Sequence, residues 1–334
     1  MAHELSFKED GQVEMAYMEG GEIPWHKLGN IWLKSDSREI KLQKCGFDHE
    51  IMQEQSFYHN PALNENIEVP NTFVNYRSDT GFPLGTVSGR YSFEGLQPEQ
   101  IFDRVSQYVG VAGLEIDTAG VLFGGKRIWM QASTNMNGEI VKGDEVTSRL
   151  LFATSYDGSI ATEFGIVGRR VVCDNTLRVA LNDKGKTTIR IPHSTKFDFN
   201  KVADELAMLN DKFKHFMIQS QALAAKHMSD TQAKDLLRDI LAKPHHSSKE
   251  KLEIDKSRVF EDIFALYSGG AKGSDLKALL GTPYQLVNAV TEYVDHHGRQ
   301  SKSFDHRFNQ TMFGAGDTLK SHAMQTAVNQ MLVA

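Results

Sequence analysis

The chain has 334 residues, of which 40% are hydrophobic and 24% charged, and this balance argues against global disorder. Its formal net charge of −6 comes from the first 100 residues, where 16 Asp and Glu stand against 8 Lys and Arg, so the uniformly basic field of a constitutive DNA binder is absent. No apolar run approaches the ~18 residues of a membrane span, and the first residues lack the pattern of a secretory signal. The two cysteines, Cys45 and Cys173, exclude a disulfide framework and a four-cysteine zinc site, and a cytoplasmic location is expected.

Residues 1–70 are polar and irregular, which indicates an arm or a small N-terminal lobe. The next segment, 72–110, mixes short strand signals with one helix that begins at Gln97-Pro98-Glu99. Four apolar residues at helical spacing are expected to bury one face of that helix: Ile101, Phe102, Val105 and Val109.

Residues 114–193 are predicted to form a sheet of hairpins. The Gly-Gly pair at 124–125 and the Asp-Gly pair at 157–158 each stand between two apolar runs, and both are hairpin signals. A further short strand is expected at 187–191. Successive hairpins indicate antiparallel pairing, because such strands need no crossover helix.

Residues 198–334 are predicted to be helical. A long helix at about 200–227 carries a seven-residue apolar repeat, which fits a helix lying across the sheet or, alternatively, a seam between helices or subunits. Two shorter helices follow at 256–267 and 283–296, the second with Thr282 as its N-cap. The repeat consists of Val202, Leu206, Leu209, Phe213, Phe216 and Leu223, with Ser220 and His227 as polar interruptions.

Strands followed by helices predict an α+β fold, with an antiparallel sheet of hairpins crossed by a long helix and a helical C-terminal part. Three parts are expected along the chain. Residues 1–70 form the polar arm or lobe, residues 71–228 form the α+β core, and residues 229–334 form the helical C-terminal region.

Cationic residues recur on the predicted strands, with aromatic residues beside them. If the strands are neighbours, some of these side chains share a sheet face, and cations with stacking rings suit one strand of nucleic acid bound without base readout. A solvated sheet face is the alternative interpretation. The predicted nucleic-acid-binding residues are Lys126, Arg127, Trp129, Arg169, Arg170 and Arg178, with Tyr156 and Phe164 as further rings.

A second candidate site is acidic. Glu292, Asp295 and His296 fall at i, i+3 and i+4 of a predicted helix and therefore share one face. Such a set could ligate a divalent metal or perform acid–base chemistry, so a metal-dependent hydrolase or nuclease is the alternative function. A polar helix end is the other interpretation. The rest of a metal shell would have to come from another segment, such as His193, His322 or Asp317.

No glycine-rich dinucleotide or phosphate loop occurs, so an ATP-driven enzyme is disfavoured, no cofactor is predicted, and a non-enzymatic role is favoured. Cys173 is expected to be a small buried residue in a strand. A Cys–His nucleophile with His193 or His296 is the alternative.

Four blocks of the sequence resemble the phage/plasmid-like family built on a bacterial domain of unknown function: 24–29, 156–159, 170–177 and 288–296. The family is carried by prophages, lytic phages and plasmids. The resemblance therefore implies a mobile genetic element and the cytoplasm of a bacterial host cell, but it implies no mechanism.

A second resemblance is architectural. Hairpins followed by a long crossing helix are similar to the core of the Rad/RecT-type single-strand annealing proteins, which work without ATP as rings or filaments with a basic groove. The leading hypothesis is thus a phage or plasmid accessory protein that binds single-stranded nucleic acid as a homo-oligomer, with strand annealing in recombination as its role. A host-protein-binding takeover factor that acts through the acidic arm is a further hypothesis, and no membrane partner is expected.

Overall fold

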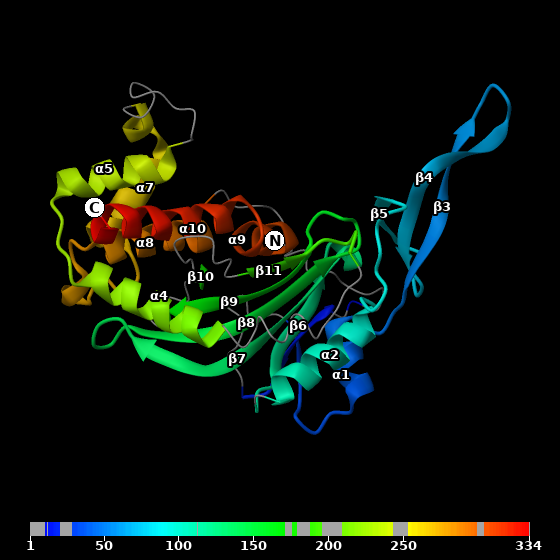
Figure 1. The fold of residues 1–334 in the computed structure, drawn as a ribbon, viewed down its shortest axis with the longest axis horizontal. Coiled ribbons are helices and arrows are strands. Elements are labelled where there is room, and N and C mark those ends of the chain that lie inside the picture. The colour runs from blue at the N-terminus through cyan, green and yellow to red at the C-terminus, as the bar shows by residue number, and fades with distance from the viewer. Residues whose placement is uncertain are drawn as a thin grey trace. The chain divides into compact units, whose positions relative to one another are not determined.

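The computed structural model (Figure 1) has a mixed α+β fold with antiparallel strands and a helical C-terminal region, as the sequence predicts. The chain divides into two compact units that are discontinuous in sequence. Unit 1 comprises residues 1–133, 150–165 and 188–207, and unit 2 comprises residues 134–149, 166–187 and 208–334. The structure describes residues 11, 13–20, 29–111, 113–170, 176–178, 188–195, 209–242, 253–298 and 304–333.

The larger sheet has the strand order β10-β9-β8-β7-β6-β1-β2, and β11 also pairs with β9. The pairs β1–β6, β6–β7, β9–β10 and β9–β11 are antiparallel, whereas β1 and β2 run parallel. The strands are β1 (Met15–Met18), β2 (Asn30–Trp32), β6 (Ile116–Leu122), β7 (Arg127–Glu139), β8 (Glu145–Ser155), β9 (Thr162–Arg170), β10 (Thr176–Arg178) and β11 (Thr188–Ile191).

Both predicted hairpins are present. A 3-10 turn, η1 (Phe123–Gly125), joins β6 to β7, and all three of its residues have positive φ, which explains the two glycines. The loop 156–161 joins β8 to β9, and there the Asp157 carboxylate accepts the backbone N–H of Ser159 at 2.9 Å. The predicted strand at 187–191 is β11.

A second sheet has the order β3-β4-β5, from β3 (Ile51–Asn60), β4 (Glu65–Arg77) and β5 (Pro83–Ser88). Strand β5 pairs with β4 only between Thr72 and Tyr76. Beyond that point β3 and β4 continue as a two-stranded ribbon, residues 56–71, which projects from the rest of unit 1 (Figure 1). The first 70 residues, predicted to be an irregular arm or lobe, thus supply β1 and β2 to the larger sheet and much of the ribbon.

Two helices, α1 (Arg38–Cys45) and α2 (Pro98–Val111), pack on the larger sheet within unit 1. Ser37 is the N-cap of α1, and its side chain accepts the N–H of Ile40. Helix α1 contacts β1, β2 and β6, whereas α2 contacts β6. The predicted apolar stripe of α2 is buried at all four positions, which stabilises the fold by roughly 1.5–3 kcal/mol for each large side chain.

The helices of unit 2 surround α8, which is buried at all ten positions and contacts α4, α5, α7 and α10. Its predicted start is confirmed, since Thr282 Oγ1 accepts the N–H of Gln285 at 3.1 Å and Pro283 is the first helical residue. The helices are α4 (Leu209–Ala224), α5 (Asp230–Leu241), α7 (Arg258–Ala265), α8 (Pro283–Glu292), α9 (Phe304–Met312) and α10 (Ala315–Val328), with 3-10 turns η2 (Ile254–Lys256) and η4 (Lys277–Leu279) and π-helical turns η3 (Leu266–Gly270), η5 (Tyr293–His297) and η6 (Asn329–Val333).

The helix predicted at about 200–227 ends at Ala224, and His227, a polar position of its predicted repeat, is exposed beyond that end. Phe213, Phe216, Ser220 and Leu223 of α4 lie in the core, and the helix packs against α8 and α10. It also touches the end of β7, where Gln221 Nε2 donates to the Glu139 carbonyl at 2.8 Å. Val202 and Leu206 lie outside the described residues.

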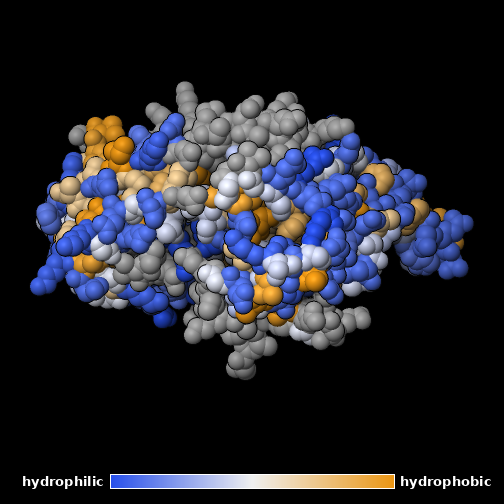
Figure 2. All heavy atoms as spheres, turned by 90° about the horizontal axis from the view of Figure 1, so that it is seen from below, coloured by the Kyte–Doolittle hydropathy of each residue, from blue (hydrophilic) through white to orange (hydrophobic). Residues whose placement is uncertain are grey.

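Within the described residues, no helix combines the length and the apolar composition needed to cross a membrane. The face seen in Figure 2 is largely hydrophilic, and its apolar residues form separate patches.

Candidate functional site

The predicted cationic residues are divided between the two units of the chain. Lys126 and Arg127 lie at the start of β7, where the Lys126 carbonyl accepts the N–H of Tyr156 at 2.8 Å. The Arg169 carbonyl instead accepts the hydroxyl of Thr147 at 3.4 Å. Lys126, Arg127 and Tyr156 belong to unit 1, whereas Thr147 and Arg169 belong to unit 2.

The predicted stacking rings are buried. Trp129 is 2% exposed, and Tyr156 and Phe164 are fully enclosed, so none of them offers a surface to a base. The alternation of side chains along a strand identifies the two faces of a sheet but does not say which one is covered. Arg170 ends β9 and Arg178 ends β10, but their side chains lie outside the described part of the chain.

A polar pocket of about 430 Å³ lies within unit 1. Its walls come from the end of β5 with the turn after it, from the β8–β9 loop, and from the turn that follows β11. The lining residues are Thr86, Val87, Ser88, Arg90, Tyr91, Asp157, Gly158, Ile160, Ala161, Pro192, His193 and Ser194.

A stacked pair of rings stands in this pocket. The Tyr91 and His193 rings have centroids 4.5 Å apart and planes inclined by 27°. The Tyr91 hydroxyl donates to the Ser155 carbonyl at 2.5 Å, and His193 Nε2 lies 3.0 Å from the Ile160 carbonyl, which only accepts, so Nε2 carries a proton. Burial lowers the pKa of His193, opposed by backbone carbonyls, so the ring is neutral at pH 7.

The loop carrying Asp157 packs closely on β5. A Cβ at Gly85 would lie 2.8 Å from the Asp157 Cβ, so only glycine permits this approach. Asp157 also accepts the N–H of Ser159, which holds its carboxylate at the pocket wall.

Two arginines flank this pocket. Arg90 lines it, is exposed, and makes no ion pair with any described residue. Arg127 is half-buried, donates to the Ser159 hydroxyl at 3.1 and 2.9 Å, and lies 5.7 Å from the centroid of the Phe123 ring. Burial lowers the pKa of the Arg127 guanidinium, and Asp157 partly opposes this, yet among the described residues no carboxylate reaches it within 4.0 Å. Both cations are therefore able to receive an anion.

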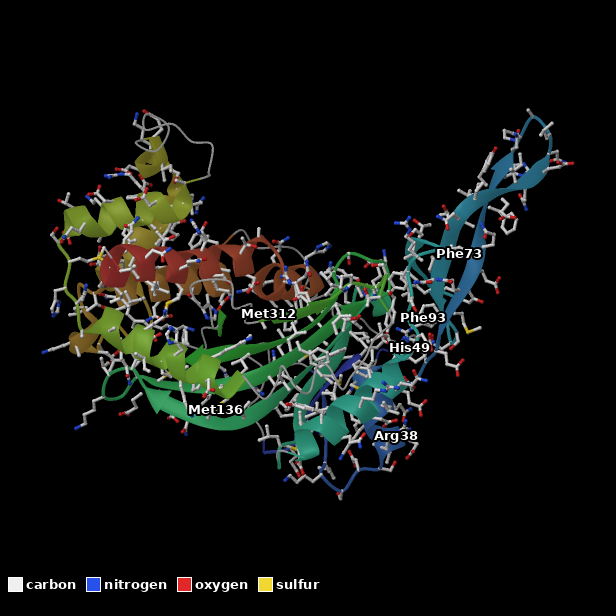
Figure 3. All side chains as sticks on the ribbon, in the orientation of Figure 1. Arg38, His49, Phe73, Phe93, Met136 and Met312 are labelled. Carbon is white, nitrogen blue, oxygen red and sulfur yellow. The ribbon has the colours of Figure 1, made fainter. Side chains whose placement is uncertain are left out.

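A larger hollow, of about 550 Å³, lies between α1 and α2 and includes Arg38 of α1 (Figure 3). The Arg38 guanidinium binds both carboxylate oxygens of Asp103 at 2.6 and 2.7 Å and also binds Glu99, which together raise its pKa. Arg38 is therefore already neutralised, whereas Lys41, the other cation of this hollow, donates to the Lys34 carbonyl at 3.2 Å.

The predicted acidic face of 292–296 is divided in the structure. The α-helix ends at Glu292 and continues as the π-helical turn η5, which changes the spacing of the face. The Glu292 carboxylate accepts the backbone N–H of Lys272 at 3.1 and 3.0 Å, whereas Asp295 Oδ1 is 2.8 Å from the buried Lys320 ammonium. His296 lies in η5, as Asp295 does.

Within the described residues, no three His, Cys, Asp or Glu side chains gather closely enough to hold a metal. Of the suggested further ligands, His193 lies in the polar pocket, His322 is exposed on α10, and Asp317 is buried on α10. Cys173 lies outside the described residues. The hydrolase hypothesis stays a prediction, without a metal site among the described residues.

Arg90 and Tyr91 are the pocket residues that sequence reasoning missed. Neither belongs to a motif, and Tyr91 meets His193 only through tertiary structure, since about a hundred residues separate them. The sequence indicates His193 only as a further metal ligand or as the partner of Cys173, and not as a neighbour of Tyr91.

The family model of a domain of unknown function, DUF932, matches residues 83–328. The chain belongs to the DUF932 family. This confirms the coarser part of the resemblance described above, a family built on a domain of unknown function. The DUF932 match includes the whole pocket and all helices from α4 to α10, whereas the ribbon precedes it. No curated protein and no solved structure matches the chain.

Proposed function

We propose that this DUF932 protein binds single-stranded nucleic acid at the polar pocket of unit 1. The observation that supports the proposal is the pair of arginines without carboxylate partners among the described residues, Arg90 inside the pocket and Arg127 beside it, next to the stacked rings of Tyr91 and His193. Of the cations predicted from the sequence, the proposal keeps Lys126 and Arg127.

The chemistry of the pocket suits a nucleotide. Arginine binds phosphate oxygens through two parallel N–H donors, and a half-buried guanidinium without an anion has already lost part of its hydration. Stacking of a base on an aromatic side chain contributes ~1–3 kcal/mol, and the ring that can provide it here is the half-buried Tyr91, because His193 is buried. A volume of about 430 Å³ falls in the usual range for a small-molecule pocket.

The finer parts of the hypothesis remain predictions. These are strand annealing, a homo-oligomeric state, a phage or plasmid source, and a cytoplasmic location in a bacterial host. A role in takeover of a host protein also remains a prediction. The annealing and takeover roles would require binding of nucleic acid or of protein and would not require catalysis.

The test measures fluorescence anisotropy of a labelled single-stranded oligonucleotide across a salt series. Replacement of Arg90 or of Arg127 by alanine should each weaken binding, and each should reduce the slope of log affinity against log salt by ~0.7, because one phosphate contact is lost. The matched control is Arg258→Ala, on an arginine of α7 whose side chain is 91% exposed.

A second comparison uses Arg169→Ala, which removes a cation of β9 that belongs to unit 2 and not to the pocket. Under the proposal it should leave affinity nearly unchanged. A wild-type chain that binds no oligonucleotide would overturn the function. Equal losses in the Arg127, Arg169 and Arg258 variants would overturn the pocket, because they would indicate attraction to charge in general.

A further inference from the structure

The ribbon, residues 56–71, is a two-stranded element with both faces uncovered by other described strands. Its register pairs Phe57 with Glu68 and Tyr58 with Ile67, so the two aromatic rings lie on opposite faces. It extends about 20 Å past the edge of β5. A two-stranded ribbon is at best marginally stable by itself, so contact with another surface would stabilise it.

Large apolar side chains are exposed along the ribbon. Phe57 is 59% exposed, Tyr58 is 51% exposed, and Leu63 at the tip is 60% exposed. The tip is nonetheless ordered, because Asn60 Oδ1 accepts the N–H groups of Ala62 and Leu63 at 3.0 and 3.4 Å. An ordered element that presents apolar side chains to solvent is typical of a protein interaction site.

The charge of the ribbon restricts its partner. Residues 56–71 contain two glutamates, Glu65 and Glu68, and no lysine or arginine. Nucleic acid is therefore excluded as the occupant, since phosphates need cations. The partner surface must be a protein surface that combines an exposed apolar side chain with positive charge.

Helix α4 carries such a surface. Ile218 is 62% exposed, the highest exposure of any large apolar side chain on the described α-helices. Lys214 precedes it by four residues and His215 by three, so both exposed side chains lie on the same face as Ile218. The ion pair of Lys214 with Asp211, at 3.6 Å, is largely exposed and therefore contributes little stability.

We propose that the ribbon is an assembly arm that docks on the Ile218 face of α4 in a second copy of the chain. The apolar side chains of the ribbon would cover Ile218, and its glutamates would face Lys212 and Lys214. Because the two surfaces differ, the contact is heterologous, and repetition of it produces a ring or a filament. The inference does not depend on the nucleic-acid proposal, since the ribbon lies outside the pocket.

Sedimentation velocity of the full chain over a concentration series tests the docking. The wild type should form species larger than a dimer. The double variant Phe57→Thr/Tyr58→Thr should be monomeric, and so should Ile218→Asp. The matched control is Ile40→Asp, at an exposed isoleucine of α1, which should assemble as the wild type does. Circular dichroism verifies the fold of each variant, and the Ile218 variant keeps the test valid if the ribbon variant misfolds.

A charge exchange tests the partner surface. Glu65→Lys/Glu68→Lys should dissociate the assembly, and addition of Lys212→Glu/Lys214→Glu should restore it. A monomeric wild type overturns the proposal. If the Ile218→Asp variant still assembles, α4 is not the acceptor and the proposed contact is wrong. The same conclusion follows if the combined charge exchange fails to restore assembly. Oligonucleotide binding by the monomeric variants separates this result from the pocket proposal.

Discussion

Glu14 and Arg77 form a buried two-pronged ion pair in unit 1. Arg77 Nη2 and Nη1 donate to the two Glu14 carboxylate oxygens at 2.7 and 3.0 Å, and the side chains are only 3–4% exposed. Arg77 ends β4, and Glu14 directly precedes β1, so the pair joins the smaller sheet to the larger one. Arg77 also donates to Asp79 at 2.9 and 2.7 Å.

This arrangement predicts a strong effect of Glu14→Gln. Removal of one partner of a buried pair leaves an uncompensated charge, which typically costs about 3–5 kcal/mol of unfolding free energy. We expect a value near the lower end, because Asp79 still neutralises part of the Arg77 charge. Urea unfolding checks it, with the more exposed Asp79→Asn as the milder comparison. A loss below about 1 kcal/mol in Glu14→Gln would contradict the prediction.

His49 lies just before β3 (Figure 3), and its lowered pKa leads us to expect that the stability of the fold depends on pH. Burial, as the larger cause, and the positive charge of Arg77, as the smaller one, lower the pKa of His49 to about 4. In the unfolded chain the imidazole has a pKa near 6.5, so between about pH 6.5 and 4 the unfolded state binds more protons. Stability is therefore complete above pH 6.5 and falls as the pH decreases to about 4, by roughly 3 kcal/mol.

Denaturation midpoints between pH 4 and 8 check this dependence. His49→Leu should flatten the decrease between pH 6.5 and 4, because the titrating ring is absent. His322→Leu, at an exposed histidine, should retain it. Parallel pH profiles for the wild type and His49→Leu would mean that His49 is not the group responsible.

Phe213 and Ile218 lie on opposite faces of α4. We therefore expect their alanine variants to differ in the unfolding free energy that they lose. Phe213→Ala should destabilise the chain by about 3–5 kcal/mol, because it opens a cavity in the helical core. Ile218→Ala, at a mostly exposed position, should change the unfolding free energy of the monomer by no more than about 0.5 kcal/mol. Thermal and urea unfolding measure both effects. An unaltered melting temperature for Phe213→Ala would show that its ring is exposed in solution.

Lys320 and Asp295 provide a test of buried charge in unit 2. Their side chains lie 2.8 Å apart and are 1% and 9% exposed. Lys320→Met or Asp295→Leu alone should cost about 3–5 kcal/mol, because each leaves the other charge buried. The double variant should lose less than the sum of the two. A double-mutant cycle with additive losses would show that the two charges do not stabilise each other.

Local patterns in the sequence predict several elements correctly. The stripe of Ile101, Phe102, Val105 and Val109 predicts α2 and its buried face, because helical periodicity determines which side chains share a face. Thr282 predicts the start of α8, since its hydroxyl satisfies a backbone N–H that the helix leaves free. Helical periodicity and N-capping depend only on residues that are close in the sequence, so the sequence alone predicts them.

Other features depend on contacts between distant segments. Strand periodicity does not reveal the order of strands or which face of a sheet is covered. The sequence pattern therefore does not show that Trp129 is buried or that Arg127 and Arg169 belong to different units. The pocket arises because the turn after β11 returns His193 to Tyr91. The sequence by itself determined the α+β class, the hairpins and the helix faces through local turn chemistry and periodicity. Only the tertiary structure decided which cations and rings meet, because that depends on the pairing of strands and turns far apart in the chain.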